Sequence, residues 1–215
     1  MDCGKGKQSP KAQANTLAMI RKLFFSQDHP TTLGTLPRPV LNQAISGNAY
    51  HTFVENIACV LGNILFLTLH VVGTETKLKK DPKTRKSHEK RMRANEAWIQ
   101  AGVQYAKRKS CRAIVFVTHA NLRYYQNPKK RKGFKVIHHA IGEAALAFTK
   151  PMLLIQRDKH TLVIDQPPFW PHFHKGAANV TRLQVPGGEH TVAAMLVEVN
   201  EGQHAEFSFT LVNAP

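Results

Sequence analysis

Histidine and acidic side chains follow two apolar runs of the sequence, at positions where an α/β sheet commonly binds its ligand. His119 comes directly after the β-branched run 113–118, and Asp158 and His160 come just after the apolar run 151–156. Ligands of open α/β sheets bind outside the carboxyl ends of the strands. Imidazole nitrogens and carboxylate oxygens there suit a divalent ion such as Zn, Mn or Fe. These side chains are therefore candidate metal ligands.

A structural interpretation of the same residues stays open. The chain contains 12 histidines, so some of them fall at strand ends by chance. Asp158 would then only end a strand. His70, late in the apolar run 64–72, is a further candidate for a residue that lines the same site. Spacing alone does not decide between a metal site and a set of ordinary strand-end side chains.

The charge of the chain indicates an anionic partner. Lys and Arg number 30 against 14 Asp and Glu, which gives a formal net charge of +16 at pH 7. A chain this basic attracts phosphate esters, nucleic acid or an acidic surface. Two runs, 77–93 and 129–135, hold much of this charge, and Tyr124 and Tyr125 lie beside the second. Such a mixture can bind phosphates by charge and bases by stacking, although solvated loops are the alternative.

The side chains that we expect to bind a polyanion come from both basic runs. They are Lys79, Lys80, Arg85, Lys129, Lys130, Arg131 and Lys132.

Composition excludes several classes of protein. Hydrophobic residues make up 42% of the chain, which is enough for a core and argues against general disorder. The chain contains no run of 18 apolar residues, so we expect neither a transmembrane helix nor a membrane partner. Its three cysteines lack paired spacing, which favours a reducing compartment over a disulfide framework. We therefore expect a cytoplasmic protein. Sequence motifs of dinucleotide-binding proteins, Walker-type nucleotide-binding proteins and serine hydrolases are all missing.

The apolar periodicity predicts the elements that would position these residues. Helical spacing covers 15–25, 87–109 and 134–148, and strand-like runs cover 57–61, 64–72, 113–118 and 151–156. Gly62 and Asn63 join the first two strands as a turn. The alternation of strand and helix predicts βαβ connections.

The last part of the chain has a different pattern. Four short runs, 161–165, 180–185, 191–199 and 206–212, lie between turns that are rich in Pro and Gly, and we interpret them as an antiparallel tail. No internal repeat and no low-complexity linker interrupts the chain. We therefore expect a single domain over residues 1–215.

The order of these segments resembles the C-terminal portion of a bacterial branch of the calcineurin-like metallophosphoesterases. The matching stretches are LAMIRKLFF, VENIACVLGNILFLTLHVVGTE, RANEAWIQAGVQYAK, AIVFVTHAN, FTKPMLLIQRDKHTLVIDQP, NVTRLQV and FSF. They extend over nearly the whole chain from Leu17 onward, and their fixed order carries the resemblance.

This resemblance implies a four-layer αββα sandwich with mixed sheets and a centre of two divalent ions, Mn, Fe or Zn, which activates water to attack a phosphoester. Carried over by position, His119 looks like the single histidine ligand that follows a core strand. Asp158 and His160 look like the paired ligands of the last metal motif. Arg157 and Asn121 would contact the substrate, and His70 would be the catalytic residue that donates to the leaving oxygen.

The sequence also departs from the family pattern. The N-terminal Asp-x-His and Gly-Asp motifs are missing, and Met1-Asp2-Cys3 looks like the end of a later family segment. We therefore expect a fold that is incomplete at its N-terminus, with a bridging carboxylate missing and an exposed sheet that favours homo-oligomers. Arg157 stands where the family has Gly, and it would crowd the metal or contact the substrate phosphate.

Three hypotheses follow from the sequence. The leading one is a metal-dependent hydrolase of phosphomonoesters or phosphodiesters, with a phosphorylated small molecule or nucleic acid as its substrate. The alternative is a non-catalytic basic module that binds nucleic acid or another polyanion. The third is a C-terminal portion without an activity of its own.

Overall fold

The chain forms a mixed α/β structure around one large sheet. The computed structural model describes residues 10–25, 29–46, 49–72, 82–122, 132–157, 161–166, 178–187, 193–200 and 207–213. Within these ranges the helices are α1 (Pro10–Phe24), α2 (Pro82–Arg108) and α3 (Lys135–Phe148), with 3-10 turns η1 (Gln43–Ser46) and η3 (Lys132–Phe134).

The strands follow the sequence runs closely. They are β1 (Leu41–Asn42), β2 (Ile57–Leu61), β3 (Ile64–Thr68), β4 (Ala113–Thr118), β5 (Met152–Gln156), β6 (Val163–Asp165), β7 (Val180–Gln184), β8 (Ala193–Val199) and β9 (Phe207–Asn213).

Seven of these strands make one sheet in the order β1-β2-β3-β4-β5-β7-β6, and β8 and β9 make a separate antiparallel pair. The neighbours β3, β4, β5 and β7 run parallel, and the two outer ends of the sheet are antiparallel. The α/β class and the βαβ connections are thus confirmed. The prediction of an antiparallel tail is wrong for β7, which joins the main sheet parallel to β5.

The error has a physical reason. The alternation of apolar and polar residues sets which face of a strand is buried, but it does not specify the neighbouring strand. Residues 180–184 bury most of their side chains, with Thr181 alone half-buried. Strands that are covered on both faces are typical of parallel pairing.

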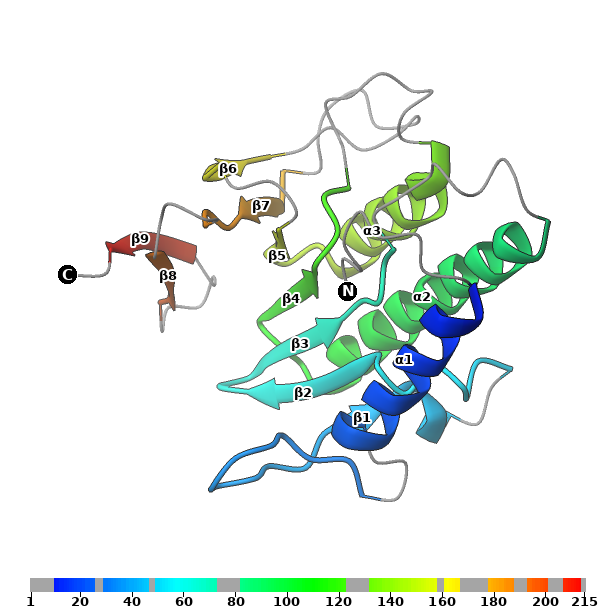
Figure 1. The fold of residues 1–215 in the computed structure, drawn as a ribbon. Coiled ribbons are helices and arrows are strands. Elements are labelled where there is room, and N and C mark those ends of the chain that lie inside the picture. Colours follow the sequence, from blue (N-terminus) through cyan, green and yellow to red (C-terminus); the bar gives the residue numbers. More distant parts are fainter. Residues whose placement is uncertain are drawn as a thin grey trace.

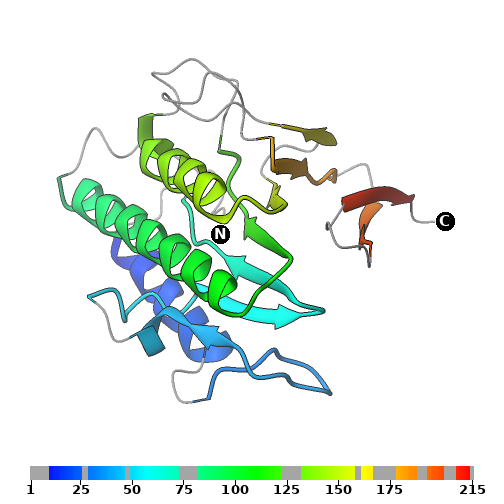
Figure 2. The same cartoon turned by 180° about the vertical axis from the view of Figure 1, so that it is seen from behind.

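Helices α2 and α3 lie side by side against one face of the main sheet (Figures 1 and 2). The core between them includes Leu67, Ile99, Phe116 and Ile141. Helix α2 packs very closely on β3, because a Cβ placed on Gly102 would lie 2.6 Å from Leu67 Cδ2. Both helices therefore hold the parallel strands from the same side.

The opposite face of the main sheet packs against the β8–β9 pair. Val115 and Leu153 are buried there, and Val197, Phe207 and Phe209 of the pair pack against them half-buried. The pair is drawn apart from the main sheet at the side of β7 in Figure 1. Its contacts with the buried side chains of the main sheet make it a second, smaller β layer.

Local sequence explains several element boundaries. Helix α2 begins at Pro82, earlier than the predicted residue 87, because proline is tolerated in the first helical turn. Helix α3 ends at Phe148, and the capping residue Thr149 has a left-handed φ of 61° and an N–H that donates to the Ala145 carbonyl oxygen. Gly62 and Asn63 have φ values of 55° and 61°, the signature of the tight turn predicted between β2 and β3.

Candidate functional site

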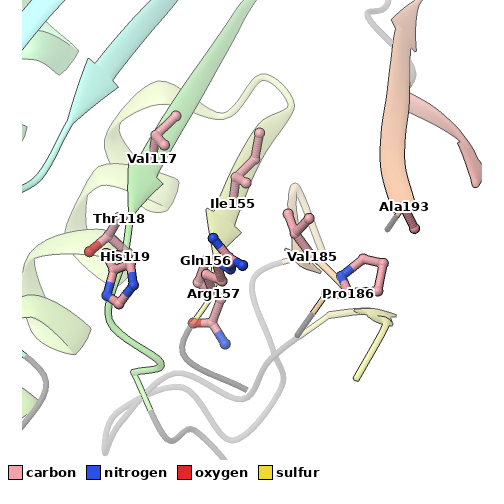
Figure 3. A pocket seen from close by; sticks show the side chains of 10 residues that line it. Val117, Thr118, His119, Ile155, Gln156, Arg157, Val185, Pro186 and Ala193 are labelled. Carbon is pink, nitrogen blue, oxygen red and sulfur yellow. The ribbon is translucent and has the colours of Figure 1, made fainter. Parts of the chain in front are cut away.

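The carboxyl ends of β4, β5 and β7 meet at a pocket of about 540 Å³. Its apolar lining comes from Val117, Ile155, Val185, Pro186 and Ala193. Figure 3 shows side chains from these three strand ends on one side of the pocket and Ala193, the first residue of β8, on the other. The pocket therefore lies between the edge of the main sheet and the start of the β8–β9 pair.

Two of the predicted site residues lie together in this pocket. His119 follows β4 and Arg157 follows β5, and the Arg157 backbone N–H donates to the His119 carbonyl oxygen at 3.3 Å. Both residues are exposed, and neither side chain makes a hydrogen bond or ion pair with another described residue. Figure 3 shows the two residues on neighbouring strand ends. The carboxyl ends of β4 and β5 are thus the place where the sequence predicts a ligand site.

The paired ligands Asp158 and His160 lie outside the residues that the structure describes. Asp158 is nevertheless the next residue after Arg157 in the chain. Among the described residues, no group of three His, Cys, Asp or Glu side chains gathers within reach of one ion. The metal centre therefore stays a prediction, for which the structure describes the position of His119 alone.

Asn121 is buried beneath this edge. Its side chain is 6% exposed, and its Nδ2 donates to Gln184 Oε1 at 2.6 Å. Gln184 Nε2 donates in turn to the Thr161 carbonyl oxygen at 2.7 Å, and the Leu122 N–H donates to Gln156 Oε1 at 3.2 Å. These amides link the ends of β4, β5 and β7. The role of Asn121 as a substrate contact stays a prediction, and its hydrogen bonds favour a structural role.

Thr118, beside His119, carries an unusual hydroxyl. The residue is 5% exposed, and its Oγ1 is buried with no hydrogen-bond partner among the described residues. A buried polar atom without a partner costs free energy, about 1–3 kcal/mol. Among the described residues, the end of β4 thus keeps a buried hydroxyl without a partner, next in the chain to the exposed His119.

His70 belongs to a different, buried cluster. Its Nδ1 lies 2.5 Å from Glu55 Oε1 and 2.7 Å from Arg91 Nη1. One ring nitrogen can donate to the carboxylate or accept from the guanidinium, but not both at once. Arg21 makes a bidentate ion pair with Glu55 at 2.7 and 2.8 Å. Glu55 therefore joins α1, the end of β3 and α2 in one charged network.

The charges of this cluster shift the pKa values of its members. Burial alone would raise the pKa of Glu55, but hydrogen bonds from His70 and Arg21 outweigh it and lower the pKa from 4.5 to about 2. Burial lowers the pKa of His70, and the nearby Arg91 adds to this effect against the opposing influence of Glu55. At neutral pH the cluster thus holds an ionised carboxylate, a neutral imidazole and two guanidinium groups.

Two buried amides, Asn56 and Asn95, hold the backbone of His70. Asn56 Oδ1 accepts from the His70 N–H at 2.8 Å, and Asn95 Nδ2 donates to the His70 carbonyl oxygen at 3.0 Å. Asn56 Nδ2 also donates to Gln43 Oε1 and Asn95 Oδ1, at 2.8 and 2.9 Å. The catalytic role of His70 stays a prediction, and its contacts argue for a role in holding the fold.

The sequence patterns did not predict that Glu55 would bind Arg21, Arg91 and His70. The available signal was a lone acidic residue in the apolar stretch VENIACV of a chain that is poor in acids. A buried carboxylate in such a chain must find a cation. The sequence did not specify which of the 30 Lys and Arg residues would supply it.

One of the predicted polyanion-binding residues is well described. Arg85 lies exposed in the first turn of α2, together with the exposed side chains of Lys83, Lys86, Lys90 and Arg93 on the same helix. Lys132 begins η3. The other predicted members, Lys79, Lys80, Lys129, Lys130 and Arg131, lie outside the described residues.

Comparisons with known proteins leave the family open. No family model matches the chain, and neither a curated protein nor a solved structure shows significant similarity to it. No helix of the described residues is both long and apolar enough to cross a membrane.

Proposed function

We propose that the protein is a metal-dependent phosphoester hydrolase of the calcineurin-like sandwich type, which acts in the cytoplasm. The observation that carries the proposal is the juxtaposition of His119 and Arg157 at the carboxyl ends of two parallel strands, on the rim of a pocket. A ligand site is expected at this edge of a parallel sheet. The second β layer formed by β8 and β9 also supports a sandwich.

The residues of this edge would divide the work. His119, Asp158 and His160 would hold the ion, and the exposed His119 imidazole suits this role because no described residue occupies its nitrogens. When bound, a divalent metal supplies an activated water and polarises the phosphoester. Arg157 would bind the phosphate oxygens through its planar guanidinium, which matches phosphate in a bidentate way. We assign no chemical step to His70, since its Nδ1 already faces Glu55 and Arg91.

The test combines metal content with turnover. Wild-type protein purified with Mn²⁺ and Zn²⁺ and then desalted is expected to retain metal and to hydrolyse an aryl phosphate. His119→Ala is expected to lose most of the metal, and its turnover is expected to fall by about a hundredfold. The measurements are elemental mass spectrometry and release of the aryl alcohol.

The matched control is His139→Ala. His139 lies on the surface of α3, and its side chain is 49% exposed. The substitution removes a histidine without touching the pocket, so metal content and turnover are expected to stay at the wild-type level. Wild-type protein that holds no metal, or an H119A variant with unchanged metal content and turnover, would contradict the proposal.

A second function is favoured by one observation on α2. Five exposed Lys and Arg side chains lie on its first half, against the single exposed acid Glu89. A helix surface of this composition can neutralise several phosphates of a nucleic acid. The alternative proposal is therefore a basic module that binds a polyanion through α2.

A further inference from the structure

We propose that the pocket selects phosphate esters whose alcohol part is apolar, with the phosphate on Arg157 and the apolar part between the ends of β4 and β5 and the start of β8. This inference rests on the proposed function and adds the substrate class. It concerns a small molecule, since a pocket of about 540 Å³ lies in the size range of small-molecule sites.

The strand register gives the pocket its apolar wall. Val117 and Ile155 are direct neighbours across β4 and β5. Val185 is held beside them, because its N–H donates to the Gln156 carbonyl oxygen at 3.0 Å. All three side chains are only partly buried, although they belong to the cluster that packs toward the β8–β9 pair. Apolar surface of the core therefore continues into the pocket and stays open there.

Among the described residues that line the pocket, the permanent charge is positive. Arg157 is the cationic side chain among the described lining residues, and no Asp or Glu is among them. The Arg157 guanidinium lies beside Gly187, where a Cβ would stand 3.5 Å from Nη2. Gly187 has a φ of 139°, a conformation that favours glycine, so the backbone beside the guanidinium is kept without a side chain.

An apolar wall next to a cation that no described carboxylate pairs with fits an amphiphilic anion. A guanidinium binds a phosphate through charge-assisted hydrogen bonds. Burial of an apolar group contributes about 25 cal/mol per Å² removed from water. A phosphate that carries a ring or a branched chain can use both contacts, and inorganic phosphate can use only the first.

Binding of non-hydrolysable probes to the full chain tests this selection. Phenylphosphonate is expected to bind about tenfold tighter than methylphosphonate in calorimetric titrations, because the ring buries apolar area. Arg157→Gln is expected to weaken both probes about tenfold. Equal affinities of the two probes for the wild-type chain would overturn the inference.

A filled pocket provides a sharper comparison. Ala193→Trp puts a large side chain at the pocket wall and is expected to abolish the preference for phenylphosphonate over methylphosphonate. Ala194→Trp is the matched control, because consecutive strand residues point to opposite faces and Ala194 is the exposed member of the pair. An unchanged preference in A193W would also overturn the inference.

These outcomes stay separate from those of the proposed function. Loss of the probe preference with intact metal-dependent turnover would remove only the apolar selectivity. A clear preference without turnover would keep the binding site and remove the hydrolase.

Discussion

At the scale of single residues, Glu55 is the centre of a charged network that lies outside the pocket. Glu55 is 8% exposed and is bound by Arg21, His70 and, at 3.5 Å, Arg91. Phe53 extends the network, since the guanidinium carbons of Arg21 and Arg91 lie 5.9 and 5.7 Å from its ring centre. The carboxylate is thus the counter-ion of both the Arg21 and the Arg91 guanidinium groups.

Glu55→Gln is expected to destabilise the protein at pH 7 by about 2 kcal/mol, because it leaves two largely buried guanidinium groups without a counter-ion. The loss depends on pH. Since folding lowers the pKa of Glu55 from 4.5 to about 2, its contribution is full above pH 4.5 and disappears as the pH falls toward 2. Denaturant unfolding of wild type and variant across this range checks both points.

The control for this experiment is Glu143→Gln, which changes an exposed carboxylate on α3. Its unfolding free energy is expected to stay within about 0.5 kcal/mol of wild type. A wild type and an E55Q variant with equal stability at pH 7 would show that the carboxylate adds nothing.

Some residues of the candidate site could be predicted from the sequence. His119 and Arg157 were expected at strand ends, and the structure places them there because the apolar runs 113–118 and 151–156 define those strands. The expected companions of His119 stay a prediction, since Asp158 and His160 lie outside the described residues. His70 was expected to share that site, but Glu55 holds its side chain instead. No local sequence pattern predicts a contact between two residues that are 15 positions apart, such as Glu55 and His70.

At the scale of elements, α2 has two different halves. Its second half buries Trp98, Ile99 and Val103 against the sheet, as the helical spacing predicted. Its first half carries five exposed basic side chains, and its last turn carries the exposed Lys107 and Arg108. One helix thus anchors the core through the buried residues of its second half and presents its larger group of cations on the first half.

Charge reversal separates these two roles. The double variant Arg85→Glu and Lys86→Glu is expected to weaken binding to a short duplex DNA and to reduce the slope of log K against log salt by about 1.8, if both side chains contact phosphate. The control is Lys107→Glu with Arg108→Glu, at the exposed far end of the same helix. It changes the net charge of the protein by the same amount as the first double variant. Equal slopes for the two variants would show that binding follows overall charge rather than this helix surface.

Element existence was easier to predict than element pairing. Residues 113–118 form β4 within the predicted bounds, because β-branched side chains fit the pleated, buried surface of a strand. Residues 180–184 also form a strand, yet they pair with β5 from much earlier in the chain. Such pairing depends on long-range packing, which local periodicity does not encode.

At the scale of the whole molecule, the two β layers have unequal support. The main sheet is covered by α2 and α3, and buried side chains fill that interface. The β8–β9 pair rests on half-buried contacts such as Val197 and Phe209, and its outer face exposes Leu196 and Val212. Regions with few buried apolar contacts open at lower free energy than the core.

Hydrogen exchange is expected to reveal this difference. Amides of β8 and β9 are expected to exchange faster than those of β4 and β5. Phe209→Ala is expected to accelerate exchange in the pair about tenfold or more while it leaves β4 and β5 protected, because it removes apolar contact at the layer interface. Thr210→Ala, on the exposed face of β9, serves as the control. Uniform exchange changes across both layers would show that they unfold as one unit.

The short outer strands of the main sheet have a consequence for association with other chains. Its two edges are β1, with 2 residues, and β6, with 3 residues, so each offers few unpaired backbone groups to a foreign strand. In the described part of the smaller layer, β8 and β9 have 7 residues each and both leave one side unpaired. Strand addition, whether in a homo-oligomer or in an aggregate, is therefore expected to begin at this hairpin, and a lysine or proline placed on its outer edge would be the first step in suppressing it.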